Sequence, residues 1–142
     1  MIINKHTFEY NGACKDEVSR FCKLWPDGLE LNAKNLELVR EHEFQIWLPG
    51  VSLYNMDFQG ANLRGANLLG ANLEEANLER ANLSRVHLYR ADLRGANLRG
   101  ADLNRADLEG AIFRNTDLSG ANMPKVILSE VQRSNCVGLD CS

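Results

Sequence analysis

Between Val51 and Glu130 the hydrophobic residues recur at every fifth position, through sixteen consecutive repeats. In the stretch ANLRGANLLGANLEEANLER, residues 61–80, each repeat consists of Ala, Asn, Leu and two variable residues. We number these positions 1 to 5, so that the Ala stands at position 1 and the Leu at position 3. All the residues at position 3 are apolar: Leu53, Phe58, Leu63, Leu68, Leu73, Leu78, Leu83, Leu88, Leu93, Leu98, Leu103, Leu108, Phe113, Leu118, Met123 and Leu128.

Neither an α-helix nor a straight strand keeps these position-3 side chains together. In an α-helix each residue turns by about 100°, so leucines five apart would wind around the whole circumference. In a strand the side chains alternate with a period of two, so Leu63 and Leu68 would face opposite sides. A right-angled corner in every repeat solves this, because four repeats then close a square coil with every Leu inside. The pattern predicts an all-β solenoid in which residues 20 apart stack about 4.8 Å from one another.

Position 5 of the repeat has the composition of a tight turn. It is Gly at 60, 65, 70, 95, 100, 110 and 120, and Asn at 55 and 115. Both residues tolerate a positive φ, which such turns require. Asn or Asp at position 2 can bond locally to the turning backbone. Position 5 is instead Arg at 80, 85, 90 and 105, and for some of these corners we expect a turn type without a positive φ.

Repeats of the form A(D/N)LxG resemble those of the pentapeptide repeat protein family. The resemblance spans Val51–Glu130 and implies a right-handed quadrilateral β-helix of about four coils, with the central Leu or Phe inside. It also implies a bacterial protein. The departures lie at the ends, since Val51–Asn55 and Met56–Gly60 lack the leading Ala and Val126–Glu130 replaces it with Val. Such atypical terminal repeats are expected of capping units.

The segments on either side of the solenoid do not repeat. Apolar residues at helical spacing predict a helix at Lys15–Trp25, and a second helix is expected at about 33–43. Alternating apolar residues predict a strand at Glu43–Leu48. We expect residues 1–50 to form a small, partly helical N-terminal cap, because an uncapped solenoid exposes unpaired backbone. A separate recognition module is the alternative, and residues 131–142 are a C-terminal tail that forms a short cap or is disordered.

The composition indicates a soluble protein without a membrane span or a secretory signal. Hydrophobic residues make up 44% and charged residues 25% of the chain, and the net charge is −3. No window approaches the roughly 18 apolar residues of a membrane span. The first residues, MIINKHTFEYNG, lack a long apolar run, so we expect a cytoplasmic protein.

The sequence offers no grouping typical of an enzyme or a metal site. It contains no phosphate-binding loop, nucleophile elbow or His-Glu-x-x-His pattern, and a leucine-filled core leaves no room for a pocket. We therefore expect no catalysis, no cofactor and no metal. The four cysteines are interpreted as reduced thiols, and a zinc site completed by His6 or His42 is the alternative: Cys14, Cys22, Cys136 and Cys141.

Two sets of outward residues are candidates for partner binding. The face built on Leu63 carries four bases against a single acid, Asp102; the bases are Arg64, Arg85, Arg105 and Lys125. The face built on Leu68 places Leu69 and Tyr89 in an outward column, with His87 and Ile127 close by. Exposed apolar and aromatic residues suit a protein contact, whereas chance exposure is the plainer interpretation.

These features predict a non-enzymatic protein–protein interaction scaffold whose partner is a protein rather than nucleic acid or a membrane. The family resemblance brings an alternative, because some pentapeptide repeat proteins resemble B-form DNA in size and charge. Those members bind type II topoisomerases such as gyrase and protect them from quinolones. DNA mimicry needs a strongly negative rod, and residues 51–130 carry ten acids and nine bases. The oligomeric state and the identity of the partner are not readable from the sequence.

Overall fold

The computed structural model describes residues 50–124, 126, 128–129 and 135–138, together with the backbone of residues 2–3 and 29–30. Two short strands, β1 (Ile2–Ile3) and β2 (Leu29–Glu30), pair antiparallel. The helices expected at 15–25 and 33–43 and the strand expected at 43–48 lie outside the described residues. The partly helical N-terminal cap therefore stays a prediction.

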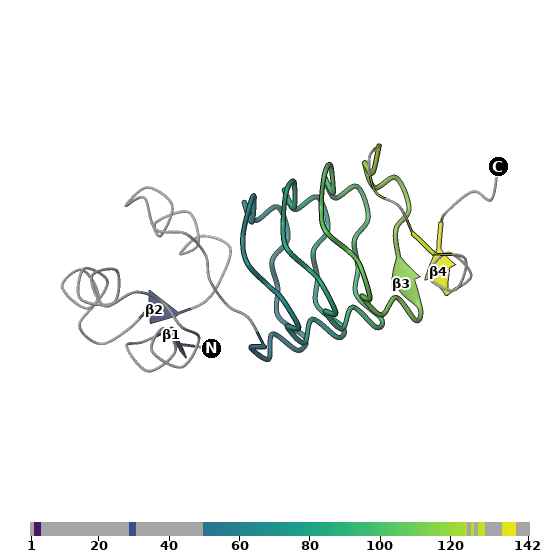
Figure 1. The fold of residues 1–142 in the computed structure, drawn as a ribbon. Helices are drawn as coiled ribbons and strands as arrows, with labels where there is room; N and C mark the ends of the chain where they lie inside the picture. Colours follow the sequence, from purple (N-terminus) through teal and green to yellow (C-terminus); the bar gives the residue numbers. More distant parts are fainter. Residues whose placement is uncertain are drawn as a thin grey trace.

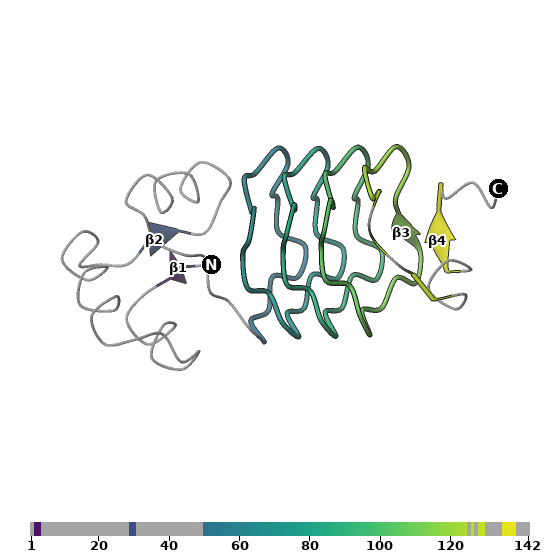
Figure 2. The same ribbon diagram turned by 45° about the horizontal axis from the view of Figure 1, so that its top comes forward.

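From Val51 onward the chain winds into a stack of four-sided coils, which Figures 1 and 2 show from two directions. The residue at position 2 of each repeat forms a parallel bridge to the residue 20 positions later. These bridges begin with Ser52 and Asn72 and continue to Asp102 and Asn122. Four repeats make one coil, as the period of five predicts.

The backbone N–H groups are accounted for position by position. Those at positions 3 and 5 donate to the following coil, as Leu83 and Arg85 do at 2.8 and 2.9 Å. The N–H at position 2 donates to the preceding coil, and that of Asn82 does so at 2.9 Å. The N–H at position 1 closes a turn, as Val86 does onto the Leu83 carbonyl at 3.1 Å. At position 4 the side chain of position 2 supplies the acceptor, as Asn82 Oδ1 does for the Ser84 N–H at 3.1 Å.

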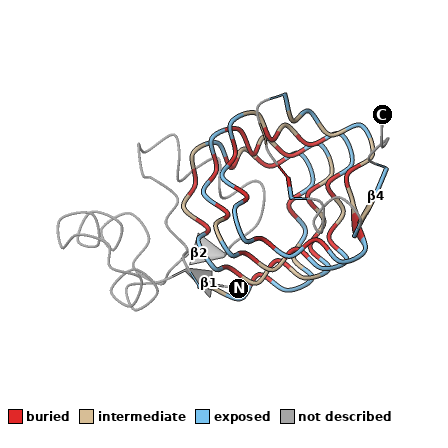
Figure 3. Ribbon diagram, turned by 45° about the vertical axis from the view of Figure 1, so that its right-hand side comes forward, coloured by how far each residue is buried: buried red, intermediate tan, exposed pale blue. Residues whose placement is uncertain are grey.

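The position-3 side chains fill the inside of the coils. Figure 3 shows buried and exposed residues alternating along each turn of the stack. Every position-3 leucine from Leu68 to Leu103 is 0% exposed, and the position-1 alanines beside them are also buried. Burying one leucine contributes roughly 1.5–3 kcal/mol. Only near the end, at Met123, is a described position-3 side chain partly exposed.

Every described corner uses a positive φ, and the expectation of another turn type at arginine corners is wrong. The position-5 residues from Gly50 to Gly120 have φ between 53° and 70°. The corners without Gly or Asn follow the same geometry: Glu75 at 59°, Arg80 at 57°, Arg85 at 60°, Arg90 at 56° and Arg105 at 61°. At the corners from Gly50 to Gly100 the stack imposes this, because each position-5 N–H donates to a carbonyl of the following coil. The cost is roughly 1–2 kcal/mol for each residue other than Gly.

At the C-terminal end the stack continues past the last repeat. Strand β3 (Thr116–Asp117) pairs parallel with β4 (Cys136–Val137) at the same offset of 20 residues, and the two lie side by side in Figures 1 and 2. Thr116 stands at position 1, where most repeats have Ala, and its buried hydroxyl donates to the Leu93 carbonyl at 2.6 Å. The segment assigned to the tail thus contributes one strand to the solenoid.

Candidate interaction surfaces

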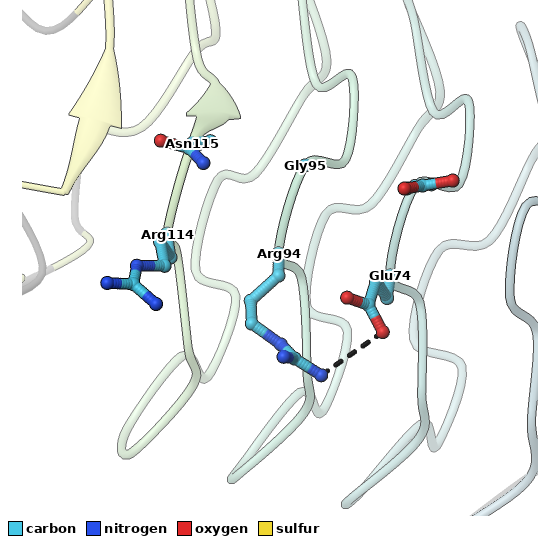
Figure 4. A pocket seen from close by; sticks show the side chains of 6 residues that line it. Glu74, Arg94, Gly95, Arg114 and Asn115 are labelled. Carbon is cyan, nitrogen blue, oxygen red and sulfur yellow. Dashed lines mark hydrogen bonds and ion pairs between the residues drawn. The ribbon is translucent and has the colours of Figure 1, made fainter.

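The charged side chains of the Leu73 face, which comprises repeats 51–55, 71–75, 91–95 and 111–115, largely pair with one another. The Arg94 guanidinium lies 2.7 Å from the Asp92 carboxylate and 3.1 Å from that of Glu74 in the preceding coil (Figure 4). The hydrogen bond from Arg94 lowers the pKa of Asp92 below 3.8, and the pair raises the pKa of Arg94. The Tyr54 hydroxyl donates to Glu75 at 2.8 Å.

A shallow hollow of about 170 Å³ lies on this face. It is lined by Glu74, Glu75, Arg94, Gly95, Arg114 and Asn115. Gly95 opens the hollow, because it places no side chain between Glu75 and Asn115 in the same corner column. Figure 4 shows Arg94 turned toward Glu74 and away from Arg114. Since Arg94 is already engaged by two carboxylates, we do not assign the hollow a ligand.

The Leu78 face, which comprises repeats 56–60, 76–80, 96–100 and 116–120, is likewise internally paired. Arg99 lies 3.4 Å from the Asp117 carboxylate, and Arg80 lies 3.7 Å from that of Glu79. The pKa of Asp117 is lowered as well, first by the hydroxyl of Ser119. On these two faces most arginines have a carboxylate beside them and little charge remains for a partner.

The Leu63 face, which comprises repeats 61–65, 81–85, 101–105 and 121–125, is different. Arg85 and Arg105 are exposed and lie one coil apart in the same corner column, and neither forms an ion pair within the described part of the chain. The nearby acid does not compensate them. The Asp102 carboxylate accepts hydrogen bonds from the Asn104 N–H and from Asn122 Nδ2, both at 3.0 Å.

The four predicted bases do not form one column. Arg64 stands at position 4, so the corner position beneath Arg85 is occupied by Gly65, whose N–H donates to the Ser84 carbonyl at 2.9 Å. Lys125 lies outside the described residues. The structure therefore brings Arg85 and Arg105 together and sets Arg64 beside their column.

The Arg85–Arg105 column breaks two local rules at once. Both residues have the positive φ that favours Gly, and they place like charges on neighbouring coils. Like charges directly opposite one another in a sheet are destabilising. Local choices that oppose the fold concentrate at functional positions. This column is the strongest candidate on the described surface.

The Leu68 face, which comprises repeats 66–70, 86–90, 106–110 and 126–130, carries the second predicted set. Leu69 is 47% exposed, His87 is exposed and Tyr89 is partly exposed. The Gly70 N–H donates to the Tyr89 carbonyl at 2.9 Å, which places Leu69 and Tyr89 in neighbouring coils. The Arg90 guanidinium lies 5.0 Å from the centre of the Tyr89 ring. Ile127 lies outside the described residues.

The two predicted sets adjoin one another, which the sequence analysis did not recognise. The corner that carries Arg85 and Arg105 joins the Leu63 face to the Leu68 face, and His87 follows Arg85 by two residues. The sequence could have shown this, because position 5 of each repeat is followed directly by position 1 of the repeat on the next face. Arg85 therefore stands next to the repeat that holds His87 and Tyr89. We call Leu69, Arg85, His87, Tyr89 and Arg105 together the corner surface.

Other side chains give no sign of metal or redox chemistry within the described ranges. No three potential ligands among His, Cys, Asp and Glu cluster there. Cys136 is half-buried, and burial raises the pKa of its thiol to about 11, so the reactive thiolate is scarce at neutral pH. Nor does the described part of the chain contain a helix long and apolar enough to cross a membrane.

Comparisons with known proteins agree with the repeat pattern. A family model described as pentapeptide repeats matches residues 57–95 and 91–129. Among solved structures, alr5209, a pentapeptide repeat protein from Nostoc PCC 7120, is 28% identical, with 75% of this chain and 95% of that chain covered and a TM-score of 0.44. HetL, a pentapeptide repeat protein involved in heterocyst differentiation regulation in the same cyanobacterium, is 37% identical over 57% of this chain and 42% of its own, with a TM-score of 0.26.

A third solved structure comes from a resistance protein. QnrB1, a plasmid-mediated fluoroquinolone resistance protein, is 29% identical over 52% of this chain and 46% of its own, with a TM-score of 0.27. The chain thus spans less than half the length of HetL and of QnrB1. A comparison with curated proteins gives no match.

Proposed function

The chain belongs to the pentapeptide repeat family, which folds as a right-handed quadrilateral β-helix, and from this premise we propose that it is a protein-binding scaffold without catalytic activity. Its repeats bury an apolar core and, apart from Ser84 and Thr116, present the described polar side chains toward the outside. Such a rod holds side chains at fixed positions in columns. Binding specificity then resides in the columns rather than in a pocket.

The observation that carries the proposal is the contrast between the corner surface and the other faces. Arg94, Arg99 and Arg80 are engaged by carboxylates of their own rod, whereas Arg85 and Arg105 are not engaged within the described residues. Unpaired cations beside exposed apolar and aromatic side chains match the composition of protein interfaces.

A pulldown from lysate with paired variants tests the proposal. Arg85→Glu with Arg105→Glu removes the basic column, and Leu69→Glu with Tyr89→Glu removes the apolar one. Arg114→Glu, an exposed arginine on the Leu73 face, is the matched control. We expect both double variants to lose the proteins that the parent chain and the control recover. If neither double variant changes the proteins recovered, the corner surface is not the binding surface.

DNA mimicry is the second candidate, and it rests on family membership rather than on the surface. The described residues of the repeats include nine acids and eight bases, so the rod is nearly neutral. The positive charge of the Arg85–Arg105 column would repel the basic surface of a DNA-binding protein. Supercoiling by purified gyrase with added protein separates the candidates. We expect neither inhibition nor protection from a quinolone at micromolar concentrations, and either effect would favour mimicry.

A further inference from the structure

The corner surface consists of two parallel columns with the same spacing. Leu69 and Tyr89 lie at position 4 of the first and second coils, and Arg85 and Arg105 lie at the corner of the second and third. Within each column the neighbours are one coil apart, as the ladder bonds Gly70 N–H to the Tyr89 carbonyl and Arg85 N–H to the Asn104 carbonyl show, both at 2.9 Å. One coil is about 4.8 Å along the axis.

That spacing discriminates between partner structures. Residues i and i+3 of an α-helix differ by about 4.5 Å along its axis, which matches one coil closely. Same-side residues of an extended strand are about 6.7 Å apart, so a strand lying along the axis falls out of step after one coil. A helix also carries an aliphatic stripe and a charged stripe side by side, whereas single-stranded DNA supplies phosphate charge and stacking bases but no aliphatic side chains to pack on Leu69.

The distance between the columns also suits a helix. Four residues of extended chain, from Arg85 to Tyr89, span at most about 14 Å. An α-helix with its side chains is about 10–12 Å across. A helix lying over His87 therefore reaches the arginine corner with one flank and Tyr89 with its underside.

Building on the protein-binding role proposed above, we propose that the corner surface receives an acidic amphipathic α-helix of the partner, lying along the coil axis. Its apolar stripe packs on Leu69 and Tyr89, and its acidic flank pairs with Arg85 and Arg105. The third coil adds a constraint. Asp107 and Glu109 are exposed on the Leu68 face there, so the helix carries neutral or basic residues above them.

Two synthetic peptides of identical composition test this inference against the full chain. The first is an 18-residue alanine-based helix with leucine at its fifth and eighth positions and glutamate at its ninth and twelfth. The second moves the glutamates to the tenth and thirteenth positions, which are separated from the second leucine by about 160° and about 140° around the helix and thus lie on the opposite side. Binding is measured by fluorescence anisotropy of a labelled peptide N-terminus, at two salt concentrations.

We expect the first peptide to bind at least tenfold more tightly than the second. The double variant Arg85→Glu with Arg105→Glu should bind the first peptide at least tenfold more weakly than the parent chain does, whereas Arg114→Glu should change that affinity by less than twofold. Raising the salt concentration should also lower the affinity of the parent chain for the first peptide. Equal affinities for the two peptides would overturn the inference, because charge alone would then govern binding. Failure of both peptides to bind at 1 mM would overturn it too.

The result is distinguishable from failure of the scaffold role. If the pulldown variants lose partners while neither peptide binds, the surface is real and its occupant is not a helix. If labelled oligothymidylate binds more tightly than the first peptide, the surface is a nucleic-acid site and the helix inference is wrong. If the pulldown is also unaffected by the variants, both proposals are wrong.

Discussion

Replacing Arg80 with Gly should stabilise the protein, although the substitution removes a long side chain from a surface corner. Arg80 has φ 57°, a conformation that an L-residue adopts at a cost of roughly 1–2 kcal/mol. Glycine adopts it freely. The Arg80 N–H donates to the Arg99 carbonyl at 2.9 Å, and a glycine N–H makes the same bond at neighbouring corners such as Gly100.

Three smaller effects oppose this gain. Glycine loses more backbone entropy on folding, which costs about 0.5–1 kcal/mol. The ion pair to Glu79 is lost, but at 3.7 Å and with the Arg80 side chain 78% exposed it contributes at most about 0.5 kcal/mol. The arginine stem also covers Gly100 of the next coil, where a built Cβ would lie 3.6 Å from Arg80 Cγ. The net expectation is a gain of roughly 0.5 kcal/mol in unfolding free energy.

Arg114→Gly is the matched control, because Arg114 is an exposed arginine at position 4 without a positive φ. There the entropy cost acts alone, so we expect a loss of about 0.5–1 kcal/mol. Urea denaturation followed by circular dichroism measures both variants, and the two should differ by about 1 kcal/mol or more. If Arg80→Gly destabilises as much as Arg114→Gly, the strain attributed to the arginine corners does not exist.

Three further predictions concern the core, the C-terminal end of the stack and the stability of the protein at low pH. Leu83→Ala, at a 0% exposed position, should lose about 2.7–5 kcal/mol in urea denaturation, and a loss below 1 kcal/mol would contradict tight packing. Gly138→Ala should lower the melting temperature of the protein more than Gly120→Ala does. A Cβ built at Gly138 lies 2.7 Å from the Cα of Ser119, whereas one built at Gly120 meets open space. Equal losses in melting temperature would contradict this. The pKa of Asp92 is held below 3.8 by Arg94, so its contribution is complete above that pH and is lost as the pH falls through the lower folded pKa. Asp92→Asn should therefore show a smaller fall in urea midpoint between pH 5 and pH 3, and an unchanged fall would count against the ion pair.

The coil geometry was predictable because the period of five excludes both regular structures. Leu63 and Leu83 had to be neighbours once a corner was placed in each repeat, and the bridges and ladder bonds confirm that register. Pro124 stands at position 4, whose N–H makes no ladder bond, so a residue without an N–H fits there.

The conformation of the arginine corners was not predictable from residue preference alone. Preference is local, whereas the positive φ at Arg85 is imposed by hydrogen bonds to a coil 20 residues away. The ion pairs of the Leu73 face could not be predicted from the sequence either. Whether Arg94 pairs with Asp92, with Glu74 or with neither depends on side-chain rotamers, which the repeat pattern does not specify. The sequence named the candidate residues, but that Arg85, His87 and Tyr89 lie at one corner became visible only when the four faces were placed in order around the coil.

Every surface in this account depends on the stacking of residues 20 apart, and an engineered disulfide tests that directly. Asn77 and Asn97 are bridged in neighbouring coils, with Nδ2 of Asn97 3.2 Å from Oδ1 of Asn77. Asn77→Cys with Asn97→Cys should close a disulfide under mild oxidation, because Cα atoms about 4.8 Å apart suit one. The native cysteines are first replaced with Ser: Cys14, Cys22, Cys136 and Cys141. Asn77→Cys with Asp102→Cys, a pair 25 residues apart, should keep both thiols free to alkylation in mass spectrometry. Closure of the second pair, or failure of the first in a folded protein, would contradict the four-repeat coil.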